Sequence, residues 1–160
     1  MLNHTFEPVF DRNSRVLILG TFPSVKSREQ GFYYGHPRNR FWKILAGLLE
    51  EPVPVTIEEK KFFLLQHGIA VWDVVSACDI TGSSDSSIKN VVPADLTMVL
   101  NHAPVKQIFA NGGKAYSLYE KYSFPVTGRE AIRLPSSSPA NAGWQLEKLM
   151  EAWKPVLEYL

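Results

Sequence analysis

Four short apolar runs constrain the fold of this 160-residue chain more than any other sequence feature. Each is rich in aliphatic or aromatic residues, and each is followed by a loop that contains Gly, Ser or Pro. Such runs are typical of buried strands in a parallel sheet, and helix-like segments separate them here. Strands that alternate with helices predict an α/β fold whose parallel sheet is covered on both faces. The predicted strands are residues 15–20, 68–73, 105–110 and 131–134.

The segments between these runs carry helix signals. Apolar residues recur with helical spacing over residues 41–48, and Thr56 with Glu59 forms a capping-box signature ahead of a further helix. Residues 1–14 are expected to form an irregular arm, and residues 76–92 a polar loop that is longer than a connection requires. The remaining predicted helices are residues 57–67, 93–102, 114–122 and 142–159.

Composition excludes several classes of protein. Apolar residues make up 45% of the chain, but no run reaches the roughly 18–20 residues that a membrane helix needs. The N-terminal segment is too polar for a signal peptide, and the single Cys78 excludes an internal disulfide and any four-Cys metal or iron–sulfur site. These features favour a reducing, cytoplasmic compartment without membrane contact. No repeat or linker divides residues 1–160, which are expected to form a single, monomeric domain.

Ligands of parallel α/β proteins bind where loops converge beyond the carboxyl ends of the strands. The loops after the four predicted strands begin at Gly20, Asp73, Asn111 and Pro135. They should therefore meet at one rim of the sheet. Their Gly, Ser, Asn and Pro content independently marks them as candidates for binding, so the sequence predicts one site at this rim.

The loop that starts at Gly20 carries most of the candidate chemistry. Residues 20–24, GTFPS, form a turn in which Gly permits close approach of a ligand, but neither GxGxxG nor GxxxxGK[ST] is present. Three aromatic residues follow at 32–34, and stacking of a base on such a ring contributes about 1–3 kcal/mol. Tyr34 is the predicted stacking residue, while core packing of two rings and an ordinary connecting turn are the alternatives. Five cations between residues 26 and 43 suit phosphate contacts, although the net charge is only +1.

Polar residues of the same rim offer further contacts. Asn39 can cap the following helix, hold a water through its carbonyl oxygen or contact a base edge, although an amide cannot remove a proton. His36 can donate to a leaving group or to a phosphate. Asp73 ends a buried strand and needs a partner, which the N–H donors of a base or a backbone amide can supply. Ser136–Ser138 lie in no Gly-x-Ser-x-Gly elbow, and they suit phosphate contacts better than nucleophilic attack.

With these motifs assembled, the chain resembles the uracil-DNA glycosylase superfamily, and within it the DNA-deoxyinosine (hypoxanthine-DNA) glycosylase family. The resemblance lies in GTFPS at 20–24, GFYYGHPRNRFW at 31–42 and LPSSSPAN at 134–141, and it covers nearly the whole chain in order. It implies a three-layer α/β/α sandwich with a central four-stranded parallel sheet. It also implies excision of a base without metal or cofactor, and it places the catalytic role on Asn39.

The chain departs from the superfamily pattern at two chemical positions. Many members carry a water-activating polar residue where this chain has Phe22, and a His or Asn where it has Leu134. Asp73 falls where relatives carry a base-reading Asn. The residue chemistry and the resemblance together predict a base pocket made of Thr21, Phe22, Tyr34 and Asp73. They predict DNA contacts from Gly20, Pro23, Ser24, His36, Arg38, Arg40, Ser136, Ser137 and Ser138.

The leading hypothesis is a monofunctional DNA glycosylase of base excision repair. It would hydrolyse the N-glycosidic bond of deoxyinosine in double- or single-stranded DNA, release hypoxanthine and leave an abasic site. A weakly paired base such as hypoxanthine costs less to flip out of the helix. Two alternatives stay open: a uracil or G:U/G:T mismatch-specific DNA glycosylase, and a non-catalytic protein that binds damaged DNA. An esterase is disfavoured, because the chain has no nucleophile elbow.

Overall fold

The central sheet of the computed structural model, which describes residues 1–160, consists of four parallel strands. These are β2 (Val16–Gly20), β3 (Ile69–Asp73), β6 (Gln107–Asn111) and β7 (Ala131–Leu134). Their order is β3-β2-β6-β7. Gly20 pairs with Asp73 and Asn111 pairs with Leu134, so neighbouring strands end level with each other. All four predicted strands are confirmed, and their loops leave from one rim.

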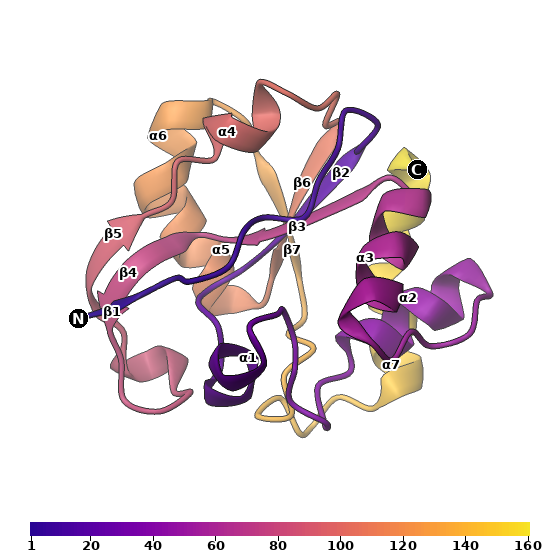
Figure 1. Cartoon of the computed structure of the whole chain (residues 1–160), viewed down its shortest axis with the longest axis horizontal. Helices are drawn as coiled ribbons and strands as arrows, with labels where there is room; N and C mark the ends of the chain where they lie inside the picture. The colour runs from indigo at the N-terminus through magenta and orange to yellow at the C-terminus, as the bar shows by residue number, and fades with distance from the viewer.

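Alternate side chains of β2 face two helical layers. Val16 and Ile18 belong to one hydrophobic core, whereas Leu17 and Leu19 belong to a second core on the opposite face. The first core is covered by α2 (Phe41–Leu49), α3 (Ile57–Gln66) and α7 (Leu146–Trp153). The second is covered by α4 (Thr97–Leu100), α5 (Gly113–Leu118) and α6 (Phe124–Thr127), with a π-helical turn at Tyr119–Ser123. The predicted three-layer α/β/α sandwich is therefore confirmed (Figure 1).

The predicted helices are present, with bounds that change at proline residues, whereas the short helices α1 (Val25–Gln30) and α6 were not predicted from the sequence. The capping box is present, because the Thr56 side chain accepts from the Glu59 backbone and the Glu59 side chain accepts from the Thr56 backbone. The predicted continuous helix 142–159 is wrong: α7 ends at Trp153 and a 3₁₀ turn follows at Lys154–Tyr159. Pro155 explains the change, because it has no N–H for an α-helical bond and its ring clashes with the preceding turn.

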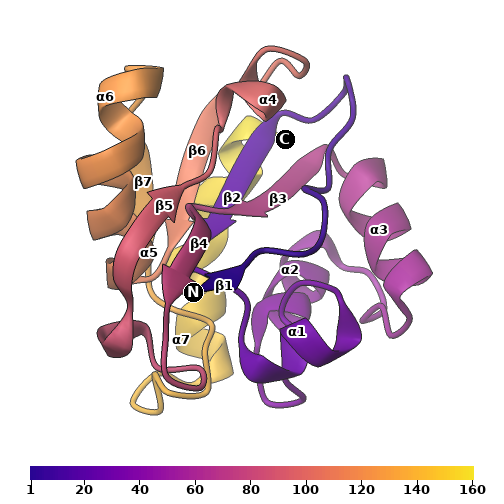
Figure 2. The ribbon, with the colours of Figure 1, turned by 60° about the vertical axis from the view of Figure 1, so that its left-hand side comes forward.

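The prediction of a polar loop over residues 76–92 is also wrong. This segment forms an antiparallel hairpin of β4 (Val75–Asp79) and β5 (Lys89–Pro93), which Figure 2 shows in front of the central sheet. A short 3₁₀ turn, Asp85–Ser87, forms its tip. Pro93 therefore ends a strand, and the next helix begins only at Thr97, whose backbone N–H donates to Asp95 Oδ1 at 3.1 Å.

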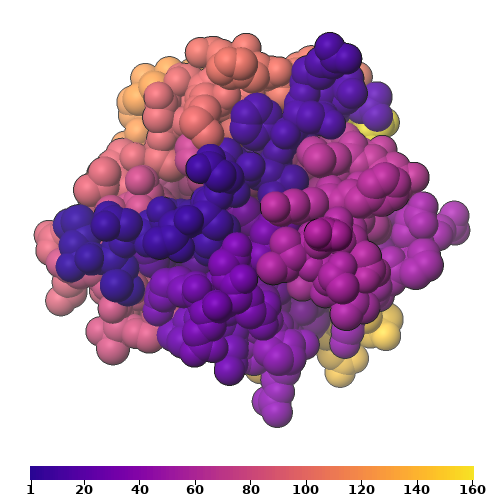
Figure 3. All heavy atoms as spheres, in the orientation of Figure 1, coloured from indigo at the N-terminus to yellow at the C-terminus, as the bar shows by residue number.

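The N-terminal arm is more regular than its sequence indicates. Strand β1 (Leu2–Asn3) pairs with β4 and completes a second sheet of order β1-β4-β5. The His4 backbone N–H donates to the Ser76 carbonyl at 2.8 Å, and Val9 forms an isolated bridge with Val71. Figure 3 shows the arm laid across this face of the molecule. Its contacts bring His4 to the carboxyl end of β3, where the arm becomes part of the candidate site. No helix of the protein combines the length and apolar character that crossing a bilayer requires.

Candidate active site at the carboxyl rim

The loops that leave the four parallel strands enclose a cavity of about 820 Å³. All of the site residues predicted from sequence line this cavity except Arg38 and Arg40. Those that do are Gly20, Thr21, Phe22, Pro23, Ser24, Tyr34, His36, Asn39, Asp73, Ser136, Ser137 and Ser138. The cavity also has a wall that the sequence did not predict, which is formed by residues 83–86 at the hairpin tip. Lys114, at the start of α5, is a further lining residue that was not predicted. The length and polarity of the segment 76–92 were the available signal for that wall.

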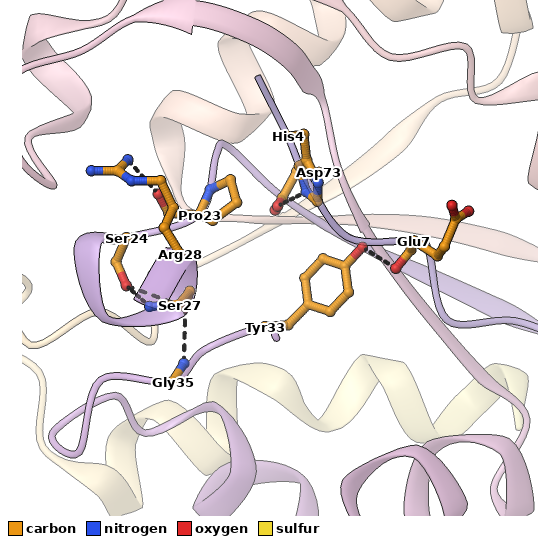
Figure 4. Close-up of polar contacts among 9 residues, drawn as sticks. All are labelled: His4, Glu7, Pro23, Ser24, Ser27, Arg28, Tyr33, Gly35 and Asp73. Atoms are coloured by element: carbon orange, nitrogen blue, oxygen red, sulfur yellow. Dashed lines mark hydrogen bonds and ion pairs between the residues drawn. The ribbon is translucent and has the colours of Figure 1, made fainter. Parts of the chain in front are cut away.

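Serine side chains fix the backbone of the first loop. Ser24 caps α1 (Val25–Gln30), because its hydroxyl accepts from the Ser27 backbone at 3.2 Å. The Ser27 hydroxyl in turn accepts from the Gly35 backbone N–H at 2.9 Å (Figure 4). Arg28 donates to the Pro23 carbonyl at 3.0 Å. These bonds hold the turn and the aromatic segment together.

The three adjacent aromatic residues have different environments. Phe32 and Tyr33 are 3% and 2% exposed, and the Tyr33 hydroxyl donates to the Glu7 carbonyl at 2.8 Å. Tyr34 has a φ of 52°, an uncommon left-handed conformation for a residue other than Gly, which turns its ring away from its neighbours. One face of that ring stacks on Phe41, with centroids 4.0 Å apart. The alternative that two rings pack in the core is therefore correct for Phe32 and Tyr33, and stacking of Tyr34 on a base stays a prediction.

The floor of the cavity, formed by Gly20, Tyr34 and Asp73, presents a hydrogen-bond acceptor beside a donor. His4 Nε2 lies 2.8 Å from Asp73 Oδ2, and both side chains are 5% exposed (Figure 4). The second carboxylate oxygen, Asp73 Oδ1, lies over Gly20: a Cβ on that glycine would be 2.5 Å from Oδ1 and 2.8 Å from the Tyr34 hydroxyl. The Tyr34 hydroxyl is buried and makes no hydrogen bond of ordinary geometry within the protein, although the Asn111 side chain lies close enough to lower the pKa of the phenol. A buried polar group without a well-formed hydrogen bond is costly, which makes the Tyr34 hydroxyl, beside Asp73 Oδ1, a candidate for ligand contact.

The Tyr34 hydroxyl keeps its proton at neutral pH. Burial, followed by the nearby negative charge of Asp73, raises the pKa of this phenol above its usual value. Both effects disfavour the phenolate. The floor therefore pairs a carboxylate oxygen that accepts with a hydroxyl that donates.

Asn39 belongs to a hydrogen-bonded chain whose direction is fixed. Its Oδ1 accepts from the Phe41 backbone N–H at 3.0 Å and from the Ser137 hydroxyl at 2.8 Å. Ser137 Oγ accepts from Asn111 Nδ2 at 2.9 Å, and Asn111 Oδ1 accepts from the Ser137 backbone N–H at 3.0 Å. Backbone N–H groups can only donate, so both amide orientations are determined. Asn39 Oδ1 has both lone pairs in use, and Nδ2 makes no hydrogen bond within the protein.

The comparisons with known proteins agree with this geometry. The family model described as the uracil DNA glycosylase superfamily matches residues 7–160. The chain belongs to this superfamily. Within it, a hypoxanthine DNA glycosylase from Methanosarcina acetivorans is 32% identical over 160 residues, covering 99% of this chain and 100% of the relative. A hypoxanthine DNA glycosylase from Methanosarcina barkeri is 32% identical over 142 residues, covering 88% and 89% of the two chains. DNA is therefore the class of substrate.

A solved structure of a related protein has a similar fold. The solution NMR structure of a candidate uracil DNA glycosylase from Methanosarcina acetivorans has a TM-score of 0.78 and 32% sequence identity. It covers 95% of this chain and 96% of its own. Within the superfamily fold of this protein, Phe22 is 8% exposed and closes the wall where other members carry a polar group. Its ring meets the His4 ring edge-on at 6.1 Å, so this position contributes packing.

The two arginines flanking Asn39 have different surroundings. Arg40 sends its guanidinium into the loop after β7, where it donates to the carbonyls of Ser137 at 3.3 Å, Ser138 at 2.6 Å and Asn141 at 3.1 Å. It also donates to the Trp144 carbonyl. The side chain of Arg38 is exposed and makes no such bond. The Arg38 guanidinium is therefore available to a DNA phosphate, whereas Arg40 stabilises the loop after β7. No group of three or more His, Cys, Asp and Glu side chains is placed to hold a metal ion.

Proposed function

We propose that this protein is a monofunctional DNA glycosylase that removes hypoxanthine from DNA containing deoxyinosine. The observation that carries the proposal is the acceptor beside a donor at the cavity floor, Asp73 Oδ1 and the Tyr34 hydroxyl. Hypoxanthine presents N1–H next to a C6 carbonyl, the complementary pattern. Adenine presents the opposite pattern, an N1 acceptor next to an N6 amino group, and its N1 would face a carboxylate. The names of the two Methanosarcina relatives support the same base.

His4 has a supporting part in this proposal. Its ring nitrogen holds Asp73 Oδ2, which leaves Oδ1 as the oxygen that meets the base. The His4 ring itself packs at 4.6 Å from Phe6 and 5.8 Å from Tyr33. A flipped base therefore meets a carboxylate that is already oriented, and less ordering is left to be done on binding.

Excision requires a flipped nucleotide, stabilisation of the departing base and a water at the sugar carbon. Asn39 Nδ2 is the amide donor without a partner inside the protein, and we assign it to the base on which negative charge develops as the bond breaks. His36, Arg38 and the serine loop Ser136–Ser138 are assigned to the DNA backbone. The protein acts in this proposal as a single domain, as a monomer and in the cytoplasm.

Excision of a panel of bases tests the proposed function. The protein is incubated with duplexes that carry one deoxyinosine, deoxyuridine, deoxyxanthosine or G:T mismatch, and abasic sites are converted to strand breaks by alkali. Hypoxanthine release should be the fastest, and adenine in a matched duplex should remain in place. Release of uracil at a much higher rate than hypoxanthine would instead establish the second candidate, a uracil glycosylase. The floor supports that candidate too, because uracil carries an N–H next to a carbonyl.

Substitution of Gly20 tests the floor. In Gly20→Ala, the new methyl group must displace Asp73 Oδ1 or the Tyr34 hydroxyl, because it would lie 2.5 and 2.8 Å from them. We expect the rate of hypoxanthine release to fall at least about tenfold. Gly143→Ala is the matched control, because a Cβ there meets no atom within 4 Å. Equal single-turnover rates for Gly20→Ala and the wild type would show that the floor residues do not contact the excised base.

A further inference from the structure

The hairpin tip is a fixed wall of the cavity. Its serine side chains order it internally: Ser87 Oγ accepts from the Thr81 backbone N–H at 2.8 Å and donates to the Ser84 carbonyl at 2.7 Å. The tip is also fastened to the first loop. The Val25 backbone N–H donates to the Ser83 hydroxyl at 2.9 Å. This wall therefore keeps its position beside the GTFPS turn although it lies some 60 residues away in the sequence.

Asp85 projects a carboxylate from this wall into the cavity. Its Oδ2 accepts from the Thr21 hydroxyl at 3.4 Å, a long bond, and the residue forms no ion pair. Its other oxygen makes no hydrogen bond within the protein. Desolvation raises the pKa of this carboxyl, opposed by the Thr21 hydrogen bond, while the charge of Asp73 raises it and that of Lys114 lowers it. The residue as a whole is exposed while its carboxyl is partly desolvated, so Asp85 lies at the wall of the cavity and not at its floor.

The other side-chain oxygens considered for the attacking water already have other partners or other tasks. Asn39 Oδ1 already accepts two hydrogen bonds. At the floor, Asp73 Oδ2 is held by His4, and Oδ1 is the oxygen assigned to the base. The GTFPS turn carries Phe22 and has no acidic side chain, and Glu29 further along the same loop does not line the cavity. Hydrolysis nevertheless needs an acceptor for a proton of the attacking water, and a carboxylate suits that task far better than an amide.

We infer that Asp85 is a further catalytic residue, the carboxylate that orients and deprotonates the attacking water. The inference rests on the proposed function. In this step the water oxygen forms a bond to C1′ of the deoxyribose, and the bond from C1′ to N9 breaks. The electron pair of that bond leaves with hypoxanthine, and the water proton passes to Asp85. Two carboxylates in one cavity thus have separate tasks: Asp73 binds the base, and Asp85 acts on the water.

Replacement of Asp85 by Asn tests the inference, because the amide keeps the size and an acceptor for Thr21 but cannot take a proton. With enzyme in excess over a duplex carrying one deoxyinosine, the excision rate should fall about 100-fold. Binding of the same duplex, followed by fluorescence anisotropy, should change less than about threefold. Asp85→Glu should retain an intermediate rate, because it keeps the carboxylate. Asp79→Asn is the control, since Asp79 lies on the same hairpin outside the cavity.

An excision rate for Asp85→Asn within about twofold of the wild type would overturn the inference, and so would an equal loss in Asp79→Asn. Failure of the proposed function gives a different result. The wild type would then release another base, and the same variants would be compared on that base. A wild-type protein that releases no base from any duplex of the panel would overturn both proposals.

Discussion

Asn39→Asp should lower the rate of hypoxanthine release by about 1000-fold while leaving the fold intact. Aspartate retains the oxygen that accepts from the Phe41 backbone and from Ser137, at 3.0 and 2.8 Å in the wild type. It replaces the Nδ2 donor by a second oxygen. A donor aimed at developing negative charge would become an acceptor that repels it, so the loss belongs to the chemical step. Single-turnover excision from a deoxyinosine duplex measures it.

Two further variants separate catalysis from the structural hydrogen bond that Asn39 makes at the start of α2. Asn39→Ala removes the Nδ2 donor together with the Oδ1 acceptor of the Phe41 backbone N–H, and loss of that hydrogen bond costs about 1 kcal/mol of stability. It should therefore lose activity as Asn39→Asp does and also melt at a lower temperature. Asn13→Asp makes the same chemical change at an exposed position outside the cavity and should remain at the wild-type rate. Undiminished excision by Asn39→Asp would show that Nδ2 has no part in the reaction.

The fold was predictable because its central strands are marked by local composition. Residues 16–20 are all fully or nearly fully buried, and an apolar run of this length ending in Gly has few other uses in a small α/β domain. The rim followed from topology alone, since parallel strands place their carboxyl ends together. The site residues in those loops could therefore be grouped without any contact being known.

The hairpin of β4 and β5 was missed because its stability does not depend on a continuous apolar pattern. Strand β5 is mostly exposed, and hydroxyl groups of serine residues order its tip. Polar residues of this kind are typical of loops. The position of Asp85 depends on pairings with a distant part of the chain, so the sequence alone left the cavity without a second carboxylate.

The orientation of Asn39 was likewise beyond local reasoning. The sequence left helix capping, water binding and base contact as alternatives. The choice depends on Ser137, which lies 98 residues further along the chain and uses one lone pair of Oδ1. Asn111, at the end of β6, then fixes the direction of the Ser137 hydroxyl. Cavities built by several loops are determined by such long-range hydrogen bonds, which residue spacing does not encode.

Arg40→Lys should destabilise the protein by about 2–4 kcal/mol, a large effect for a substitution that conserves charge. The planar guanidinium of Arg40 donates to four backbone carbonyls of one loop, those of Ser137, Ser138, Asn141 and Trp144. A lysine ammonium has three donors on a flexible stem and cannot reach all four. Carbonyls left without a donor in a partly buried loop account for the loss. Thermal unfolding should show a melting temperature lower by roughly 10 °C.

Arg38→Lys provides the matched control for this loss, because its exposed side chain makes no hydrogen bond within the protein. Its stability should remain within about 0.5 kcal/mol of the wild type. Arg38→Ala should instead weaken DNA binding and reduce the salt dependence of the affinity by about one phosphate contact, whereas it leaves the melting temperature unchanged. Equal melting temperatures for Arg40→Lys and Arg38→Lys would contradict the structural role of Arg40. The two basic residues of the PRNRFW segment would then both belong to the DNA-binding surface, and the serine loop would need another anchor.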